Sequence, residues 1–415
     1  MKVIDTGKLT LFASKKWVNI LVDAIGDRSG RSLPFDVDTF TAVNTLNHVI
    51  NAHGVQPLHA PARITSVNQQ DIPSVSSNCH NVVLSIEQEG EAVLPSSLFV
   101  KLPMPSLTTR WFFSIIGSWQ LESYFFKHVA PNVPLRTPHT YATHSEGTRF
   151  FLIQENLHED PSVQLFTNPD MMAGPSLELV HRCLDSFARL HAHHYNLRTD
   201  EREAILPLDN HPFLGPQMRI VSQALNSLGL KPCMKRLPGC ISADVVEAYK
   251  KTLRHWDELL GFWFSGPLSL LHGDSHLGNF FVSGDEMGML DFQAVHWGKG
   301  IRDVQYFLID SLPTEILAAH EQDLVRYYVD RRGHHGTAIE LDRTWQEYRS
   351  FTYHTLMTIV VSIGFGALNK EQNSLMEEIL GRAVAAVQRV DYAGWLEDFL
   401  SGLAREPQQK AEPGT

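Results

Sequence analysis

The stretch from Ser269 to Phe292, SLLHGDSHLGNFFVSGDEMGMLDF, constrains this chain more than any other segment. An apolar run leads into His272-Gly273-Asp274, and Asn279 follows five residues after Asp274. A carboxylate and a carboxamide follow an apolar run that we expect to be buried. Their polar oxygen atoms should therefore lie next to the interior of the protein. The segment therefore predicts a functional site rather than a surface loop.

The residues after Asn279 predict a β-hairpin with strands at 280–282 and 287–290 and a turn at 283–286. A hairpin holds its two ends side by side, so Asn279 at its entry and Asp291 at its exit should meet near Asp274. Two carboxylates and a carboxamide then surround one point. This set of oxygen donors suits a hard cation such as Mg²⁺.

The spacing His-x-Asp-x₄-Asn followed by Asp-Phe resembles the catalytic and metal-binding loops of protein kinases, aminoglycoside phosphotransferases and choline kinases. The resemblance implies that Asp274 is the base, that Asn279 and Asp291 hold Mg²⁺ on ATP, and that His272 braces the loop. The form HGDxHxGN with DFQ, with His276 where protein kinases usually carry lysine, is typical of small-molecule kinases. The alternative is that Asp274 and Asp291 are turn residues and His272 is a core histidine.

Bulk properties limit the possible partners and compartment. A chain of 415 residues is long enough for two lobes or domains. A net charge of -11 and a pI near 6.0 argue against nucleic acid or an anionic membrane as the main partner. The four cysteines form no CxxC pair, and the longest apolar run, at 357–368, is interrupted by glycine and serine. We therefore expect a cytoplasmic protein; the sequence does not indicate its oligomeric state.

Residues 1–60 predict an N-terminal helical extension, because apolar side chains recur there at helical spacing. From residue 62 the pattern becomes strand-like. Three such segments, separated by turn residues, predict an antiparallel meander that opens a small lobe over 61–157; they lie at 62–70, 80–88 and 96–103.

The link between the first two strands, residues 71–78, lies where a kinase-like fold has its phosphate-covering loop. It contains no glycine, which departs from the glycine-rich pattern of protein kinases. Ser76, Ser77 and Asn78 instead resemble the short loops of the ecdysteroid-kinase-like branch. Their hydroxyl and backbone N–H groups could bind phosphate, although a plain hairpin turn is the alternative.

Lys101 ends the third strand among apolar residues, where an unpaired ammonium group would be costly. Glu122 is the only acidic residue between Lys101 and Glu146, and it lies in an aromatic-rich segment that predicts one helix over about 109–129. A Lys101–Glu122 ion pair satisfies both charges. In kinase-like folds such a pair orients the nucleotide phosphates. The alternative is a surface lysine and an exposed glutamate.

A second hairpin is predicted over 138–157, with its tip at 145–148. It resembles the strands that lead to the hinge between kinase lobes, so the adenine edge should meet backbone near Gln154 to Leu157. Glu155 and Leu157 are therefore candidate nucleotide contacts. The polar residues that follow predict the lobe boundary at 158.

The second lobe, residues 158–404, is predicted to be mainly helical and to precede a disordered tail at 405–415. Residues 200–245 are rich in proline and predict loops. We expect helices at 176–196, 245–263, 314–328, 344–368 and 373–390, and a short one at Trp395.

Two polar features of this lobe have competing interpretations. Asp303 resembles the residue that braces the catalytic loop in this superfamily, and it also fits the N-cap of a helix starting at Val304. A candidate metal site is formed in the sequence by His191, His193 and His194. His193 and His194 cannot share a helical face and no carboxylate or cysteine is nearby, so we interpret them as polar residues at a helix end.

Together these observations predict an α+β, protein-kinase-like two-lobe fold, most similar to the ecdysteroid-kinase-like branch of the aminoglycoside phosphotransferase and choline kinase superfamily. The resemblance implies ATP-dependent transfer of phosphate, with Mg²⁺, to a small-molecule hydroxyl. The alternatives are a nucleotide-binding pseudokinase that acts as an interaction module, an aminoglycoside-type antibiotic kinase, and a protein kinase.

The acceptor pocket is expected between the loops at 200–265 and the helices after Asp291. Large aromatic residues in these regions favour a neutral or weakly cationic alcohol with apolar surface. The alternative is that these aromatics form core. They are Trp256, Phe262, Trp263, Trp297, Tyr306, Trp345, Phe351 and Tyr353.

Overall fold

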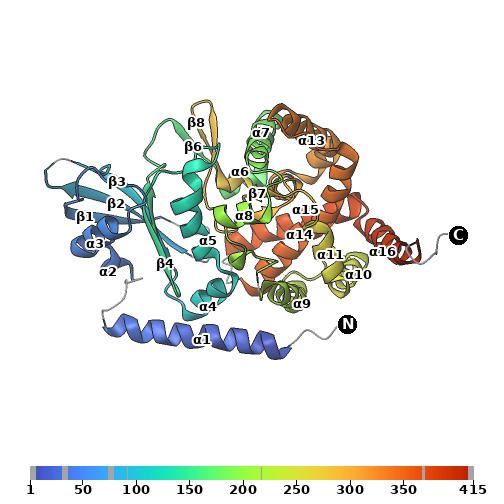
Figure 1. The fold of residues 1–415 in the computed structure, drawn as a ribbon, viewed down its shortest axis with the longest axis horizontal. Helices are drawn as coiled ribbons and strands as arrows, with labels where there is room; N and C mark the ends of the chain where they lie inside the picture. The colour runs from blue at the N-terminus through green and yellow to red at the C-terminus, as the bar shows by residue number, and fades with distance from the viewer. Residues whose placement is uncertain are drawn as a thin grey trace.

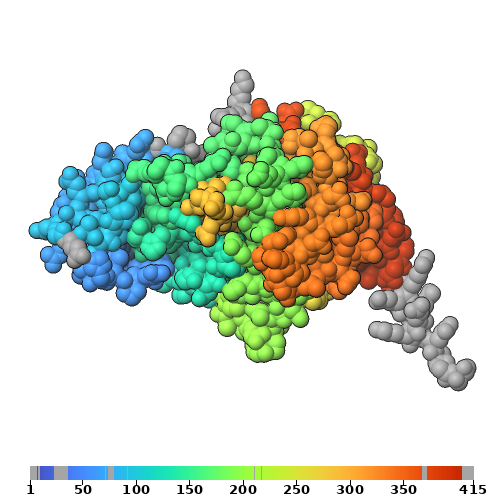
Figure 2. Space-filling view, turned by 90° about the horizontal axis from the view of Figure 1, so that it is seen from above, coloured from blue at the N-terminus to red at the C-terminus, as the bar shows by residue number. Residues whose placement is uncertain are grey.

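The computed structural model describes residues 6–29, 36–72, 79–90, 92–215, 217–366 and 370–409. The chain forms two lobes: a five-stranded sheet with helices at one end and a larger, mainly helical lobe at the other (Figure 1). The space-filling view shows the same division, with the first part of the chain in blue and the last part in orange and red at opposite ends (Figure 2). This is the predicted α+β, kinase-like architecture.

The first lobe is built on an antiparallel sheet with strand order β1-β2-β3-β5-β4. Its strands are β1 (Ile64–Ile72), β2 (Cys79–Gln88), β3 (Ser97–Pro103), β4 (Thr140–Glu146) and β5 (Arg149–Glu155). The predicted meander is confirmed, because β2 pairs with both β1 and β3. The predicted second hairpin is β4–β5. β3 lies in the middle of the sheet, so nearly all its side chains are buried.

Helices cover this sheet and extend beyond it. They are α1 (Thr6–Ser29), α2 (Val37–Thr41) and α3 (Val43–His53). Phe40 and Leu46 are fully buried in the apolar cluster that α2 and α3 share with the sheet. The longer α1 lies along α4 (Leu107–Ile116), where Trp17 stacks on Trp111 with ring centroids 5.4 Å apart (Figure 1). The predicted helical extension is therefore present in the described residues.

The helix expected over 109–129 is not continuous. α4 ends at Gly117, whose φ of 74° is left-handed, and the chain then forms α5 (Ser118–Tyr124) and a π-helical turn, η1 (Phe125–Val129). Glycine adopts this conformation without a Cβ clash, so it ends one helix and redirects the next. The redirected α5 carries Glu122 into the interior, where it is 1% exposed.

The second lobe is mainly helical, as predicted, and no described helix has the length and hydropathy that crossing a membrane would require. The predicted helices agree with α7, α13, α14 and α15 to within a few residues, except that α13 extends further. The helix α16 continues into the predicted disordered tail. The α-helices are α6 (Asn168–Ala173), α7 (Leu177–His193), α8 (Thr199–Ile205), α9 (Met218–Arg236), α10 (Ala243–Arg254), α11 (Trp256–Trp263), α12 (Ile301–Ser311), α13 (Thr314–His334), α14 (Leu341–Phe365), α15 (Lys370–Arg389) and α16 (Tyr392–Gln409).

Two predictions for this lobe are wrong. Residues 200–245 are not mainly loop, because α9 runs through Pro232. Close packing accounts for it: a Cβ on Gly364 of α14 would lie 2.6 Å from the backbone oxygen of Gly229 in α9. Tertiary packing of this kind overrides local propensity. The helix predicted at 245–263 is divided in two at His255.

Two small sheets support the segment that the sequence singled out. One joins β7 (Ser269–Leu271) to β10 (His296–Gly298), and the other has the order β6-β8-β9. The strands of the second are β6 (Val163–Leu165), β8 (Phe280–Ser283) and β9 (Glu286–Met289). The predicted hairpin is therefore confirmed as β8–β9.

Candidate active site

Lys101 lies at the centre of an ion cluster that joins the two lobes. Its Nζ is 2.9 Å from Glu122 Oε1 and 3.0 Å from Asp291 Oδ1. The predicted Lys101–Glu122 pair is confirmed, whereas the contact with Asp291 was not predicted. Burial favours loss of the proton from Lys101, but Asp291 and Glu122 outweigh it and raise the pKa of Lys101. The ammonium group is therefore held in its charged form.

The loop after β7 is attached to α12 through Asp303. The carboxylate of Asp303 accepts hydrogen bonds from the backbone N–H groups of His272 (2.6 Å) and Gly273 (3.1 Å). His191 Nε2 lies 3.2 Å from it and Arg302 3.1 Å. Asp303 lies inside α12, so it does not cap a helix that starts at Val304. Its contacts are those of the predicted loop brace.

Gly273 makes the tight loop possible. Its φ is +88°, and a Cβ there would lie 1.9 Å from the carbonyl oxygen of Ala294. No other residue fits this position without moving the backbone. The loop and the segment after Asp291 are therefore in direct backbone contact at this glycine.

His272 holds the loop from within. Its Nε2 donates to the carbonyl of Leu290 at 2.9 Å, and its Nδ1 accepts the backbone N–H of Asp274 at 3.2 Å. Burial lowers the pKa of His272, so the ring is neutral and carries its hydrogen on Nε2. These contacts orient Asp274 and do not bring His272 to a reacting atom.

Asp274 faces a cavity and has partners that the sequence reasoning missed. Gln293 Nε2 donates to its Oδ2 at 3.2 Å, and the Tyr306 hydroxyl donates to its Oδ1 at 3.3 Å. Burial alone would raise the pKa of Asp274, but electrostatic attraction to His276 and other nearby groups outweighs burial and lowers this pKa. Asp274 is therefore ionised at neutral pH, as a base must be. Gln293 could have been found from the sequence, because it is the glutamine of the DFQ motif.

The hairpin brings Asn279 and Asp291 together at its open end, where the Leu290 N–H donates to the Asn279 carbonyl at 3.0 Å. The Asn279 side chain donates through Nδ2 to the carbonyl of Asp274 at 2.6 Å, which leaves its Oδ1 as the possible ligand atom. Asp291 has a left-handed backbone, with φ of 62°. One of its oxygens contacts Lys101, so the other is the candidate ligand.

This donor set fits Mg²⁺ that arrives with a nucleotide. Mg²⁺ in phosphate-transferring sites is typically held by one or two side chains together with phosphates and water. Asn279 and Asp291 supply two such oxygen donors. In the described part of the chain, no group of three His, Cys, Asp or Glu side chains could hold a metal ion by itself. Two oxygen donors fit a Mg²⁺ ion that nucleotide phosphates and water would also hold.

The predicted nucleotide contacts are only partly covered by the structure. Ser76, Ser77 and Asn78 lie outside the described residues. The Glu155 carboxylate accepts from Arg136 at 2.9 and 3.2 Å, and its backbone N–H donates to the His139 carbonyl. Leu157, which follows β5, is 7% exposed. The adenine contact near these two residues stays a prediction.

A cavity of about 640 Å³ opens beside Asp274. It lies between the first lobe and helices of the second, broadly where the acceptor pocket was expected. Asp274 is the only carboxylate among its described lining residues. Most of the wall is apolar and comes from α4, α9 and α14, with Trp17 of α1. Its large apolar side chains are Trp17, Trp111, Phe112, Phe113, Phe213, Met218, Met357 and Phe365.

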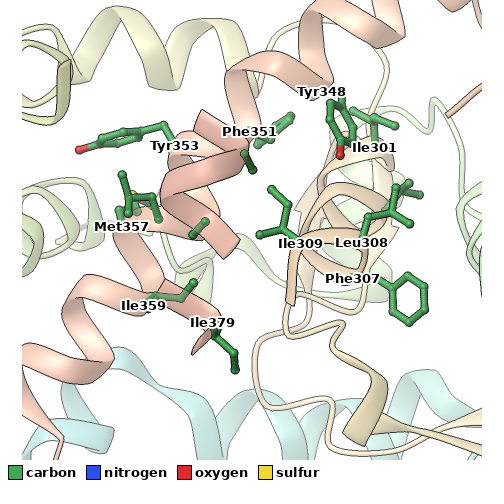
Figure 3. Packing of buried hydrophobic residues seen from close by; sticks show 14 of the residues in the cluster. Ile301, Phe307, Leu308, Ile309, Tyr348, Phe351, Tyr353, Met357, Ile359 and Ile379 are labelled. Carbon is green, nitrogen blue, oxygen red and sulfur yellow. The ribbon is translucent and has the colours of Figure 1, made fainter. Parts of the chain in front are cut away.

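The predicted wall residues are mostly wrong, because only Tyr306 reaches this cavity. Five of the others are core residues with at most 2% exposure: Trp256, Trp263, Trp297, Phe351 and Tyr353. Figure 3 shows Phe351 and Tyr353 among the buried side chains that pack around α12 and α14. Sequence reasoning also omitted α4, since nothing in its pattern indicates that a first-lobe helix lines the cavity beside Asp274.

The three histidines at the end of α7 have separate contacts. His191 binds Asp303 and lies 2.9 Å from the Tyr328 hydroxyl through its Nδ1. The rings of His193 and His194 contact each other edge to face, at 4.5 Å. Within the described ranges no suitable cluster surrounds them. Their interpretation as polar residues at a helix end stays a prediction.

Comparison with known proteins identifies the family. A family model described as ecdysteroid kinase-like matches residues 75–335, which is more than half of the chain. The chain belongs to the ecdysteroid kinase-like family. This membership places it among small-molecule kinases and phosphotransferases, and the matched range contains the ion cluster, the Asp274 loop and the hairpin.

Three solved structures also show partial similarity to the chain. Choline kinase from Cryptosporidium parvum Iowa II has 13% identity and a TM-score of 0.46, covering 81% of this chain and 90% of its own. Choline kinase LicA from Streptococcus pneumoniae has 11% identity and a TM-score of 0.46, covering 79% and 94%. The ternary complex of APH(2")-IIa with streptomycin and ATP has 12% identity and a TM-score of 0.44, covering 82% and 94%. No curated protein sequence matches the chain.

Proposed function

We propose that this protein transfers the γ-phosphate of ATP to a hydroxyl group of a small, partly apolar alcohol. The observation that carries the proposal is the position of Asp274, whose carboxylate opens into an apolar cavity. The same loop reaches the Lys101–Glu122–Asp291 cluster through Asn279 and the β8–β9 hairpin. One loop thus faces a space for an acceptor on one side and a charged cluster suited to phosphates on the other.

Each residue has a distinct proposed role. Asp274 is the base that accepts the hydrogen of the acceptor hydroxyl, and its lowered pKa keeps it ionised. Lys101, oriented by Glu122, neutralises nucleotide phosphate charge. Asn279 and Asp291 are the Mg²⁺ ligands, and Mg²⁺ when bound supplies further neutralisation of phosphate charge. The protein's own contribution is mostly positioning.

Two further sets of residues complete the proposal. His272 is a positioning residue, because its contacts fix the loop rather than touch reactants. The backbone near Glu155 and Leu157 is proposed to meet the adenine edge. Ser76, Ser77 and Asn78 are proposed to contact the phosphates.

The cavity supports an acceptor that is neutral or weakly cationic. A site for a polycationic sugar is expected to gather several carboxylates, whereas Asp274 is the only one among the described lining residues. Arg302 also lines this cavity, where its charge is paired with Asp303. Phe112 and Phe365, whose rings lie 6.2 Å apart, offer apolar surface away from the base. Such walls bind apolar surface with few polar anchors.

The test is steady-state ATP consumption with matched panels of sterol-like or terpenoid alcohols, amino alcohols and aminoglycosides. We expect turnover of apolar or weakly cationic alcohols, and its loss in Asp274→Asn. Phe365→Ala should raise the KM for the alcohol and leave the KM for ATP unchanged. Turnover confined to aminoglycosides would favour an antibiotic kinase. Nucleotide binding without turnover of any panel member would favour a pseudokinase.

A further inference from the structure

A second buried carboxyl group, Asp310, lies beside the proposed base and has no role in the steps above. It is on α12, its side chain is 3% exposed, and its Oδ1 has no hydrogen-bond partner in the described part of the molecule. Arg382 of α15 is the cation that faces it. That guanidinium instead donates from NH1 to the backbone carbonyls of Asp310 and Met171, at 2.9 and 3.1 Å. An ionised Asp310 would therefore be poorly compensated.

Tyr306 connects Asp310 to the base. The two residues are four positions apart on α12 and so share one helical face. The Tyr306 hydroxyl donates to Asp274 Oδ1 at 3.3 Å, and the carboxyl group of Asp310 lies one helical turn along the same face of α12. Tyr306 is thus placed beside both carboxyl groups. The titratable or charged groups that face Asp310 are Asp274, Tyr306 and Arg382.

The number of hydrogens fixes the direction of these bonds. A phenol has one hydrogen to donate, and an ionised carboxylate has none. With the Tyr306 hydrogen donated to Asp274, a hydrogen bond between Tyr306 and Asp310 requires Asp310 to be the donor. Burial, together with the charge of Asp274, raises the pKa of Asp310 to about 8, which agrees with a protonated Asp310 at neutral pH.

We propose that Asp310 is a positioning residue, which donates to the Tyr306 oxygen as a neutral acid and thereby directs the Tyr306 hydroxyl to the base Asp274. The inference rests on the proposed function. In the chemical step, Asp274 accepts the hydrogen of the acceptor hydroxyl while the acceptor oxygen bonds to the γ-phosphorus and the bond to the ADP oxygen breaks. Asp310 exchanges no proton with the substrate. Once Asp310 is ionised, two anions compete for the Tyr306 hydrogen, and Asp274 loses its fixed donor.

The first arm of the test needs no acceptor. The pKa of Asp310 is raised in the folded state, so the folded protein holds a proton that the unfolded chain releases. The melting temperature of wild type should therefore fall relative to that of Asp310→Asn as the pH rises from about 4 to about 8, with no further divergence above. In an Asp274→Asn background this window should end at lower pH, because a neighbouring charge is absent. Equal pH dependence of wild type and Asp310→Asn, or a window insensitive to Asp274→Asn, would overturn the proposal.

The second arm is the pH profile of kcat with Mg-ATP and the alcohol that the panel turns over best. We expect kcat of wild type to fall above about pH 8, and Asp310→Asn, whose amide can donate at any pH, to lack this decline. Tyr306→Phe should lower kcat roughly tenfold with an unchanged KM for ATP. The exposed Asp323→Asn is the matched control and should keep the alkaline decline.

The two arms separate the two hypotheses. An alkaline decline that persists in Asp310→Asn would refute the positioning role, as would a Tyr306→Phe variant with wild-type kcat at every pH. A wild-type protein that turns over no alcohol would refute the proposed function. In that case the first arm would still decide whether Asp310 holds a proton in the folded protein at neutral pH.

Discussion

Replacing Asp303 with asparagine should separate the catalytic loop from its support. The Asp303 carboxylate accepts two backbone N–H bonds, at 2.6 and 3.1 Å, and also contacts Arg302 and His191. Asparagine is nearly the same size, but one of its two terminal atoms is a donor. The asparagine nitrogen would then face an N–H donor that the Asp303 carboxylate now accepts. The buried Arg302 would also lose its counter-charge.

The expected cost follows from these contacts. Hydrogen bonds to a charged group contribute roughly 1.5–3 kcal/mol each, and breaking a buried ion pair typically costs about 3–5 kcal/mol. We therefore expect Asp303→Asn to lower the free energy of unfolding by about 3–5 kcal/mol at pH 7. Burial alone would raise the pKa of Asp303, but the hydrogen bond from His191 and the charge of Arg302 outweigh it and hold this pKa well below its usual value of 3.8. This stabilisation is fully present above that pH and is lost as the pH falls below it.

The assay is urea denaturation of wild type and Asp303→Asn at several pH values, together with kcat at pH 7. The exposed Asp200→Asn is the matched control, because its side chain is 71% exposed and its change should stay within about 0.5 kcal/mol. The gap between wild type and Asp303→Asn should narrow below about pH 4. A cost at pH 7 as small as that of the control would refute the reasoning.

Three further predictions concern the site. Lys101→Met and Glu122→Gln should weaken Mg-ATP binding non-additively in calorimetry, because each removes the same interaction; additive losses would contradict the coupling. Asp274→Asn should reduce kcat roughly 10²–10⁴-fold with little change in nucleotide affinity, whereas Asp291→Asn should weaken Mg²⁺-dependent nucleotide binding; equal nucleotide affinity of wild type and Asp291→Asn would contradict the metal assignment. Gly273→Ala should give a protein with lower melting temperature and kcat, since its φ is +88°; wild-type values of both would show that the loop is not constrained there.

Local patterns predicted the framework well because each rests on short-range physics. The meander, the β8–β9 hairpin and α7 all follow from periodicity and turn residues. The Lys101–Glu122 pair followed from a single acid opposite a buried lysine. The two failures have different causes: Gly117 ends a helix locally by adopting a left-handed conformation, whereas Pro232 lies inside a helix that propensity would break and packing keeps.

The sequence by itself determined which chemistry is available, because the order and spacing of Asp274, Asn279 and Asp291 along a loop and hairpin fix their proximity. Only the tertiary structure decided what surrounds them. Aromatic residues look alike in sequence whether they line a cavity or fill the core, so the wall from α4, α9 and α14 could not be foreseen. The same holds for Tyr306 and Asp310, since helical spacing puts them on one face but does not show that the base lies against it.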